Sequence, residues 1–200
     1  MALMSSTTED PGLPPPLSTR DQESLLDIAW ASIRHGVHHG SPLIPDPDRL
    51  SPRLRETGAA FVTLESGGGL RGCIGTLEAV DALGVDVAHN AFRAAFRDPR
   101  FPSLTSGELD SLDLHLSILG PPVPLVAGSE AELLAGLEPG KDGLILELPP
   151  GHRGTFLPQV WESLPDGKAF LAHLRRKAGL SPDFWSPELR FHRYRMREVG

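Results

Sequence analysis

The sequence predicts an α+β fold with mainly antiparallel sheets and flanking helices. Segments with the apolar spacing of a helix are interleaved with hairpin-like and alternating segments, and no strand-helix-strand unit repeats along the chain. Glycine and proline are abundant, at 21 and 20 of 200 residues, which predicts many turns and short elements. A helical bundle or coiled coil is therefore not expected.

The first half of the chain indicates a helix, a hairpin, a second helix and a strand. Thr19 and Gln22 have capping-box spacing, and apolar residues at helical intervals extend the first helix to about His38. Two apolar strands flank the Ser-Gly-Gly-Gly turn at 66–69, which predicts a hairpin over residues 59–77. Helical spacing returns at Leu83 and ends at Asp98-Pro99. Strict alternation over 112–118 then predicts a half-buried strand.

The second half indicates a helix, a hairpin, a helix and a terminal strand. Ser129 and Glu132 can cap a short helix that ends near Leu137. Residues 143–148 have the composition of a strand and are followed by a turn at 151–154. Apolar spacing around Phe170 predicts a further helix, and residues 189–199 alternate as a final strand.

Charge and composition exclude several classes of protein. The net charge of −7 argues against a protein that coats nucleic acid, whose surface would be broadly basic. One cysteine cannot form an internal disulfide, and no apolar run approaches the roughly 18 residues that span a bilayer. Residues 1–18 have the Pro, Ser and Thr content of a disordered leader. We therefore expect a cytoplasmic protein, not bound to a membrane, with one domain over residues 19–200.

The basic charge is concentrated at the end of the chain. Residues 168–200 carry eight basic and three acidic side chains, a net +5, which leaves −12 for the remainder. Arg193, Arg195 and Arg197 alternate there and could receive an anionic ligand or partner. Pairing with carboxylates of the same chain is the favoured interpretation, and it predicts a tail that docks on the body of the protein.

The stretch Leu70–Thr76, LRGCIGT, contains the only cysteine. If the strand period holds, Arg71, Cys73 and Gly75 share one face, where the guanidinium could favour the thiolate form of Cys73. Gly75 would then leave room for a ligand or another backbone. The alternative is structural, because a free cysteine often packs as a small hydrophobe. The residues alone favour the structural role.

Two other clusters are weaker candidates for a site. Asp98 and Arg100 lie in a rigid proline-containing loop, after a helix that contains Asn90. Such loops often host binding or catalytic sites, but an internal ion pair can also serve only to stabilise the loop. His35, His38 and His39 have a spacing that could bring two imidazoles to one metal ion, but no further ligand cluster accompanies them, and we predict no metal site. The common nucleotide-binding, metalloprotease and hydrolase signatures are absent, so the sequence indicates no particular cofactor.

Several stretches together resemble one family, the domain of the AMME chromosomal-region candidate protein, called AmmeMemoRadiSam system protein A in prokaryotes. They occur in family order over about residues 21–197. The matching stretches are FVTL at 61–64, LRGCIGT at 70–76, AFRDPRF at 95–101, DGL at 142–144, GTFLPQVW at 154–161 and residues 174–179.

The resemblance implies an α+β fold of two intertwined lobes with a cleft near the LRGCIG segment. It also implies a pathway shared with a Memo-like protein and a radical SAM enzyme. The site residues carried over are Arg71, Gly72, Cys73, Gly75 and Thr76. Their expected cleft neighbours are Asn90, Asp98 and Arg100.

Two functions remain open at this point. In the first, the protein is a binding or accessory module whose cleft takes a small anion, a peptide or a partner protein. In the second, it is an enzyme in which Cys73, tuned by Arg71, serves as a nucleophile or carrier thiol. The sequence slightly favours the binding module, since no histidine or carboxylate lies at a motif spacing from Cys73 to act as its base.

Overall fold

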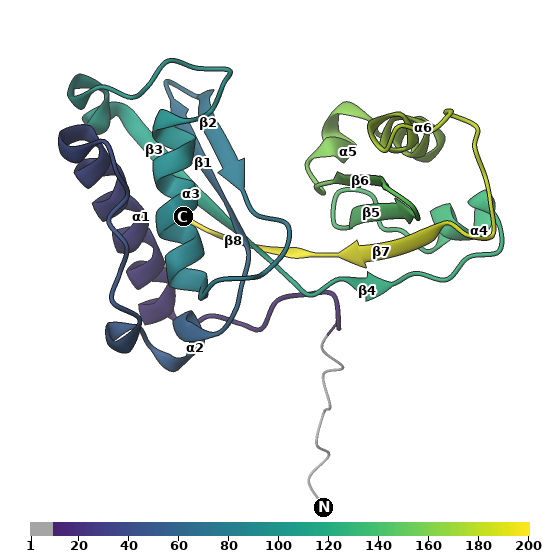
Figure 1. Cartoon of the computed structure of the whole chain (residues 1–200), viewed down its shortest axis with the longest axis horizontal. Coiled ribbons are helices and arrows are strands. Elements are labelled where there is room, and N and C mark those ends of the chain that lie inside the picture. Colours follow the sequence, from purple (N-terminus) through teal and green to yellow (C-terminus); the bar gives the residue numbers. More distant parts are fainter. Residues whose placement is uncertain (1–9) are drawn as a thin grey trace, which may run out of the picture. The chain divides into compact units, whose positions relative to one another are not determined.

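The computed structural model describes residues 10–200 and is an α+β protein with two four-stranded sheets (Figure 1). The chain forms two compact units. The N-terminal unit comprises Pro15–Leu119 and Arg197–Gly200, and the C-terminal unit comprises, of the described residues, 10–14 and Gly120–Met196. Each unit therefore takes segments from both ends of the chain. The predicted fold class is confirmed.

The N-terminal unit contains three helices and four strands. The helices are α1 (Thr19–His39), α2 (Pro52–Arg55) and α3 (Leu83–Phe96), and 3-10 turns cover Pro47–Arg49 and Ser106–Ser111. The sheet has the order β2-β1-β3-β8, with β1 at Ala60–Ser66, β2 at Gly69–Gly75, β3 at Leu112–Leu119 and β8 at Met196–Val199. Strand β1 pairs antiparallel with both β2 and β3.

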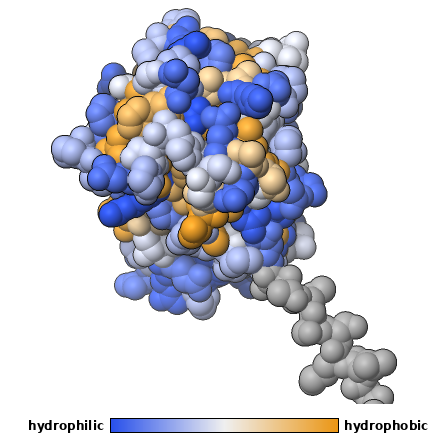
Figure 2. All heavy atoms as spheres, turned by 90° about the vertical axis from the view of Figure 1, so that its right-hand side faces the viewer, coloured by the Kyte–Doolittle hydropathy of each residue, from blue (hydrophilic) through white to orange (hydrophobic). Residues whose placement is uncertain are grey.

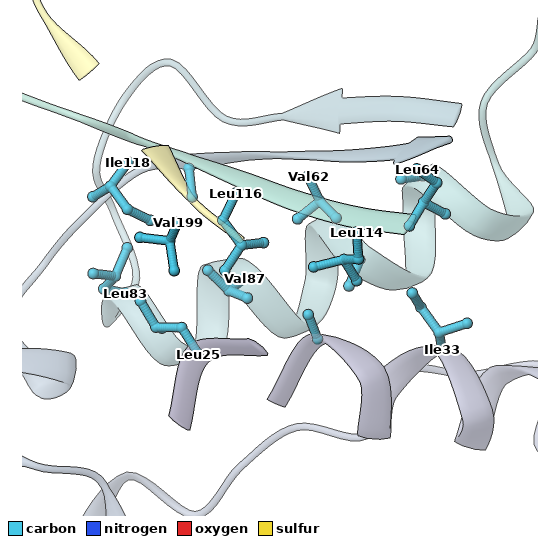
Figure 3. Packing of buried hydrophobic residues seen from close by; sticks show 14 of the residues in the cluster. Leu25, Ile33, Val62, Leu64, Leu83, Val87, Leu114, Leu116, Ile118 and Val199 are labelled. Carbon is cyan, nitrogen blue, oxygen red and sulfur yellow. The ribbon is translucent and has the colours of Figure 1, made fainter. Parts of the chain in front are cut away.

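The helices α1 and α3 cover one face of this sheet (Figure 3). Ile33 of α1, Val87 of α3 and Val62 of β1 are fully buried in the same apolar cluster. Gly36 allows α1 to approach α3 closely, because a Cβ atom there would lie 2.4 Å from the Phe96 ring. Residues of β1 and β3 that alternate with the buried ones therefore lie on the opposite face.

The C-terminal unit packs helices against a second sheet of order β4-β7-β5-β6. Its strands are β4 (Val123–Pro124), β5 (Gly143–Leu148), β6 (His152–Phe156) and β7 (Arg190–Tyr194), and its helices are α4 (Glu130–Ala135), α5 (Val160–Ser163) and α6 (Gly167–Lys177). Strand β5 pairs antiparallel with β6 and β7. Phe170 is fully buried and stacks on Trp161 with the ring centroids 3.8 Å apart.

The predicted terminal strand is divided between the two sheets. Strand β7 ends at Tyr194 and β8 begins at Met196, so Arg195 lies between them. The tail is docked, since Phe191 and Tyr194 are buried. Arg195 forms ion pairs with Asp10, Glu138 and Asp142.

Residues of the expected leader also take part in the fold. Residues 1–9 lie outside the described part of the chain. Asp10 pairs with Arg195, Leu17 is buried, and Ser18 caps α1. Ordered structure therefore begins before Thr19. Among the described residues, no helix is long and apolar enough to cross a membrane.

Candidate functional site

The backbone of Cys73 is held by the loop that follows α3. Strand β2 is at an edge of its sheet, where backbone groups lack a neighbouring strand. The Cys73 N–H donates to Oδ2 of Asp98 at 2.9 Å, and Nη2 of Arg100 donates to the Cys73 carbonyl oxygen at 3.2 Å. Asp98 and Arg100, which we call the edge clamp, therefore satisfy both backbone groups of one residue.

The two members of the edge clamp also bind each other. Arg100 donates to Asp98 through Nε at 2.9 Å and through Nη2 at 2.7 Å, which is a bidentate ion pair. Hydrogen bonding to Arg100 is the main reason that the pKa of Asp98 lies well below its usual value, and the Cys73 N–H lowers it further. The carboxylate is thus ionised at neutral pH and acts as a hydrogen-bond acceptor.

The Cys73 thiol is hydrogen-bonded to the side chain of Thr63. Thr63 Oγ1 donates to Sγ at 3.4 Å. Within residues 10–200, no histidine or carboxylate is hydrogen-bonded to the sulfur. The pKa of Arg100 is raised, chiefly by Asp98 but also by the Cys73 side chain, so its guanidinium lies near the thiol.

Arg71 is directed to other partners than the thiol. A register shift in the β1–β2 pairing matches Glu65 with Leu70 and Leu64 with Gly72, which leaves Arg71 as the extra residue of a bulge. Its Nε donates to Oε1 of Glu108 at 2.7 Å, and its Nη2 donates to the Pro102 carbonyl oxygen at 3.0 Å. The pairing lowers the pKa of Glu108 to about 2. The guanidinium near the thiol is therefore that of Arg100, and the expectation that Arg71 stabilises the thiolate finds no contact to support it.

The glycines of LRGCIGT allow close packing. A Cβ atom on Gly72 would lie 2.2 Å from the Ala94 carbonyl oxygen of α3, and one on Gly75 would lie 2.2 Å from the Phe61 ring. The space that we expected Gly75 to leave for a ligand is therefore filled by Phe61, its cross-strand partner. The absence of a side chain at both glycines therefore lets β2 pack closely against α3 and against the Phe61 ring.

Asn90 and Thr76 belong to a separate buried network. Asn90 Nδ2 donates to Thr76 Oγ1 at 2.9 Å, to the Ala60 carbonyl oxygen at 3.2 Å and to Oδ2 of Asp86 at 3.0 Å. Asp86 also accepts the Ala60 N–H at 2.8 Å, and burial raises its pKa. These groups tie the ends of the hairpin to α3. No hydrogen bond within the described chain joins them to Cys73.

The sheet brings two further side chains into one row with Cys73. Thr63 pairs with Cys73 in β2 and with His115 in β3, so the three residues lie side by side on neighbouring strands. His115 is exposed. The sequence patterns did not indicate Thr63, His115 or Glu108 as site residues. Counting back from the hairpin turn places Thr63 near Cys73 but pairs it with the neighbouring residue Gly72, because the count ignores the bulge.

The histidines at the end of α1 form a small exposed cluster. The rings of His35 and His39 have centroids 4.2 Å apart, and Nδ1 of His35 lies 2.8 Å from the Ser41 carbonyl oxygen. Among residues 10–200, no group of three or more His, Cys, Asp or Glu side chains could hold a metal ion.

Comparison with known proteins identifies the family. The AMMECR1 family model matches residues 26–199. The chain belongs to the AMMECR1 family. A protein of Methanothermobacter thermautotrophicus is 40% identical over 185 residues, which cover 90% of this chain and 93% of that protein. A protein of Methanosarcina mazei is 42% identical over 173 residues, covering 84% of this chain and 85% of the relative.

A solved structure has the same fold. The crystal structure of uncharacterized protein PH0010 from Pyrococcus horikoshii matches with a TM-score of 0.79 and 31% sequence identity. The match covers 91% of this chain and 92% of that chain. The AMMECR1 family has no established biochemical function, so a function for this chain must be argued from its own residues.

Proposed function

We propose that this AMMECR1 protein is a non-catalytic binding module, and that its recognition surface is the sheet face that carries Cys73, Thr63 and His115. The observation that carries the proposal is that the charged side chains around Cys73 bind groups other than its sulfur. Asp98 binds the backbone of Cys73, and Arg71 binds Glu108, so neither is placed as a base or as a partner of the sulfur. A rigid strand edge with a polar face suits recognition.

The exposed guanidinium of Arg100 favours a ligand that carries an anionic group. More than half of its side chain is exposed, at 53%, although Asp98 beneath it is 1% exposed. The hydrogen bonds of Arg100 to Asp98 and to the Cys73 carbonyl oxygen use Nε and Nη2, so Nη1 is left as a donor for a carboxylate or a phosphate. The Phe101 ring lies 5.4 Å from the guanidinium carbon and provides an apolar neighbour.

We propose a protein partner, namely the Memo-like protein of the pathway that the family resemblance implies, acting with a radical SAM enzyme. The supporting features are the family membership and a face large enough to include three strands. A chain with one cysteine, which forms no internal disulfide, also suits the cytoplasmic setting of such a pathway.

The test measures affinity for the purified Memo-like protein of the same genome by calorimetric titration. His115→Lys places a bulky charge in the row beside Thr63 and should weaken binding by about tenfold or more. Glu23→Lys is the matched control, because Glu23 is an exposed residue of α1, which covers the opposite face. Equal affinity of both variants and the wild type would contradict the proposed surface.

A catalytic function remains a second candidate because the Arg100 guanidinium lies near the Cys73 thiol. The guanidinium is near enough for the Cys73 side chain to raise the pKa of Arg100, and Cys73 is only partly buried. A nucleophilic role would require a reactive sulfur. Native-state alkylation separates the two candidates.

A further inference from the structure

A groove on the C-terminal unit is separate from the residues around Cys73. It lies where the segment after β4 runs beside the segment that leads into β7, and its volume is about 260 Å³. Pro124, Val126 and Pro187 supply apolar lining, and Pro124 pairs with His192 in the β4–β7 register, so these two side chains share a face of the sheet. Figure 2 draws the right-hand side of Figure 1, where hydrophobic residues lie among hydrophilic ones. The groove can therefore receive a compact apolar group.

The lining also contains two basic side chains and no acidic one. Arg190 and His192 are both lining residues, and neither side chain has a hydrogen bond or ion pair within residues 10–200. The acidic residue nearest in sequence, Glu188, is not part of the lining. An uncompensated guanidinium beside apolar walls favours a ligand that combines an anionic group with an apolar one.

The sheet explains why Arg190 is free. Glu147 of β5 lies directly opposite Arg190 in the register, and it would be the natural ion-pair partner. Its other cross-strand neighbour, Arg153, holds it instead, with Nε of Arg153 3.1 Å from Oε1. One carboxylate thus lies between two arginines, and the positive charge of Arg190 is available at the groove.

We propose that this groove binds a small carboxylic acid, with the carboxylate on Arg190 and an aromatic or branched apolar group against the walls. A cavity of about 150 Å³ can hold benzene, so about 260 Å³ accommodates one ring and a short acidic arm. A peptide added as a further strand is disfavoured. Pro121, Pro122 and Pro124 at the β4 edge cannot donate the hydrogen bonds that such pairing needs.

The experiment is a titration of the full chain with phenylacetate, followed through backbone amide chemical shifts by NMR. We expect saturable shifts concentrated in residues 124–127 and 187–192. Phenylacetamide has the same shape without the charge and should bind about tenfold more weakly or worse.

Two variants decide the role of the guanidinium. Arg190→Gln removes the charge from an exposed position and should weaken phenylacetate binding by about tenfold. Arg20→Gln, at an exposed arginine of the other unit, should leave the affinity unchanged. The proposal is overturned if phenylacetate causes no saturable shift or shifts residues elsewhere. It is also overturned if the amide, or the Arg190→Gln variant, binds as well as the wild type binds phenylacetate.

Discussion

The carboxylate of Asp98 accepts the backbone N–H of Cys73, and Arg100 donates to the carbonyl oxygen of the same residue. Two side chains of one loop thus take the place of a neighbouring strand at the edge of the sheet. In this arrangement the buried carboxylate is hydrogen-bonded to the backbone of the cysteine and not to its sulfur. Asp98 acts on the backbone, and the sulfur faces Thr63.

Asp98→Asn should destabilise the fold. The substitution keeps the size of the side chain but removes the ion pair with Arg100 and weakens the bond to the Cys73 N–H. We expect the free energy of unfolding to fall by about 2 kcal/mol, within the range for hydrogen bonds to charged groups. Urea denaturation measures the loss. Asp48→Asn, at an exposed residue, is the matched control and should change little.

Stability should fall at acid pH through the same residue and through Glu108. Both carboxyl groups have a lower pKa in the folded chain than in the unfolded one, and that of Glu108 falls from 4.5 to about 2. Their stabilising contribution is therefore present above the unfolded pKa and is lost as the pH falls through the folded pKa. The difference in unfolding free energy between wild type and Asp98→Asn should shrink from pH 6 to the lowest measurable pH. A constant difference would contradict the ionic role of Asp98.

Gly72→Ala should separate the hairpin from α3. The new methyl group would meet the Ala94 carbonyl oxygen at 2.2 Å, which the backbone cannot avoid by a side-chain rotation. Overpacking of this kind costs about 1 to 3 kcal/mol, so thermal unfolding should occur at a lower temperature. Gly107→Ala is the control, since no atom lies within 4 Å of the added group. Equal melting temperatures for the two variants would show that the strand can move away freely.

Arg195→Gln tests the docking of the tail. Asp142 is fully buried and would lose its ion pair with Arg195, while its weaker contact with Arg193 at 3.7 Å remains. A buried carboxylate that loses its closest ion pair is costly, and we expect a loss of about 3 kcal/mol in the free energy of unfolding. A second substitution, Asp142→Asn, should recover part of this loss. No recovery in the double variant would show that the two residues act independently.

The sequence was sufficient to predict the longer helices and strands, because apolar periodicity and turn residues are local signals. It did not indicate α2, β4 or α5, and the turn expected at 151–154 lies mostly within β6. The N-cap of α1 shows that the exact first residue of a helix is less certain than the helix itself. Capping-box spacing indicated Thr19 and Gln22, whereas Ser18 is the residue that caps α1, with its hydroxyl accepting the Asp21 N–H at 3.1 Å. Two adjacent hydroxyl residues offer the same signal, and the packing of Leu17 against the core selects between them.

The partners of the site residues could not be predicted in the same way. The turn at 66–69 alone would pair Thr63 with Gly72, but the bulge at Arg71 moves the register by one residue and pairs Thr63 with Cys73. Nor does strand alternation indicate that Glu108, well beyond α3 in sequence, binds Arg71. Such contacts depend on the tertiary path of the loop. Likewise, strand alternation does not indicate that Arg195, between β7 and β8, pairs with Asp10, Glu138 and Asp142.

The most direct test of the account is the reactivity of Cys73 in the folded protein. The rate of alkylation by iodoacetamide would be followed by mass spectrometry between pH 6 and 9, with N-acetylcysteine as the reference thiol. A recognition residue without a base should react no faster than the reference at any pH, and Arg100→Gln should not slow it. A sulfur that reacts faster than the reference near pH 7, and loses this advantage in Arg100→Gln, would contradict the binding module and support the nucleophile.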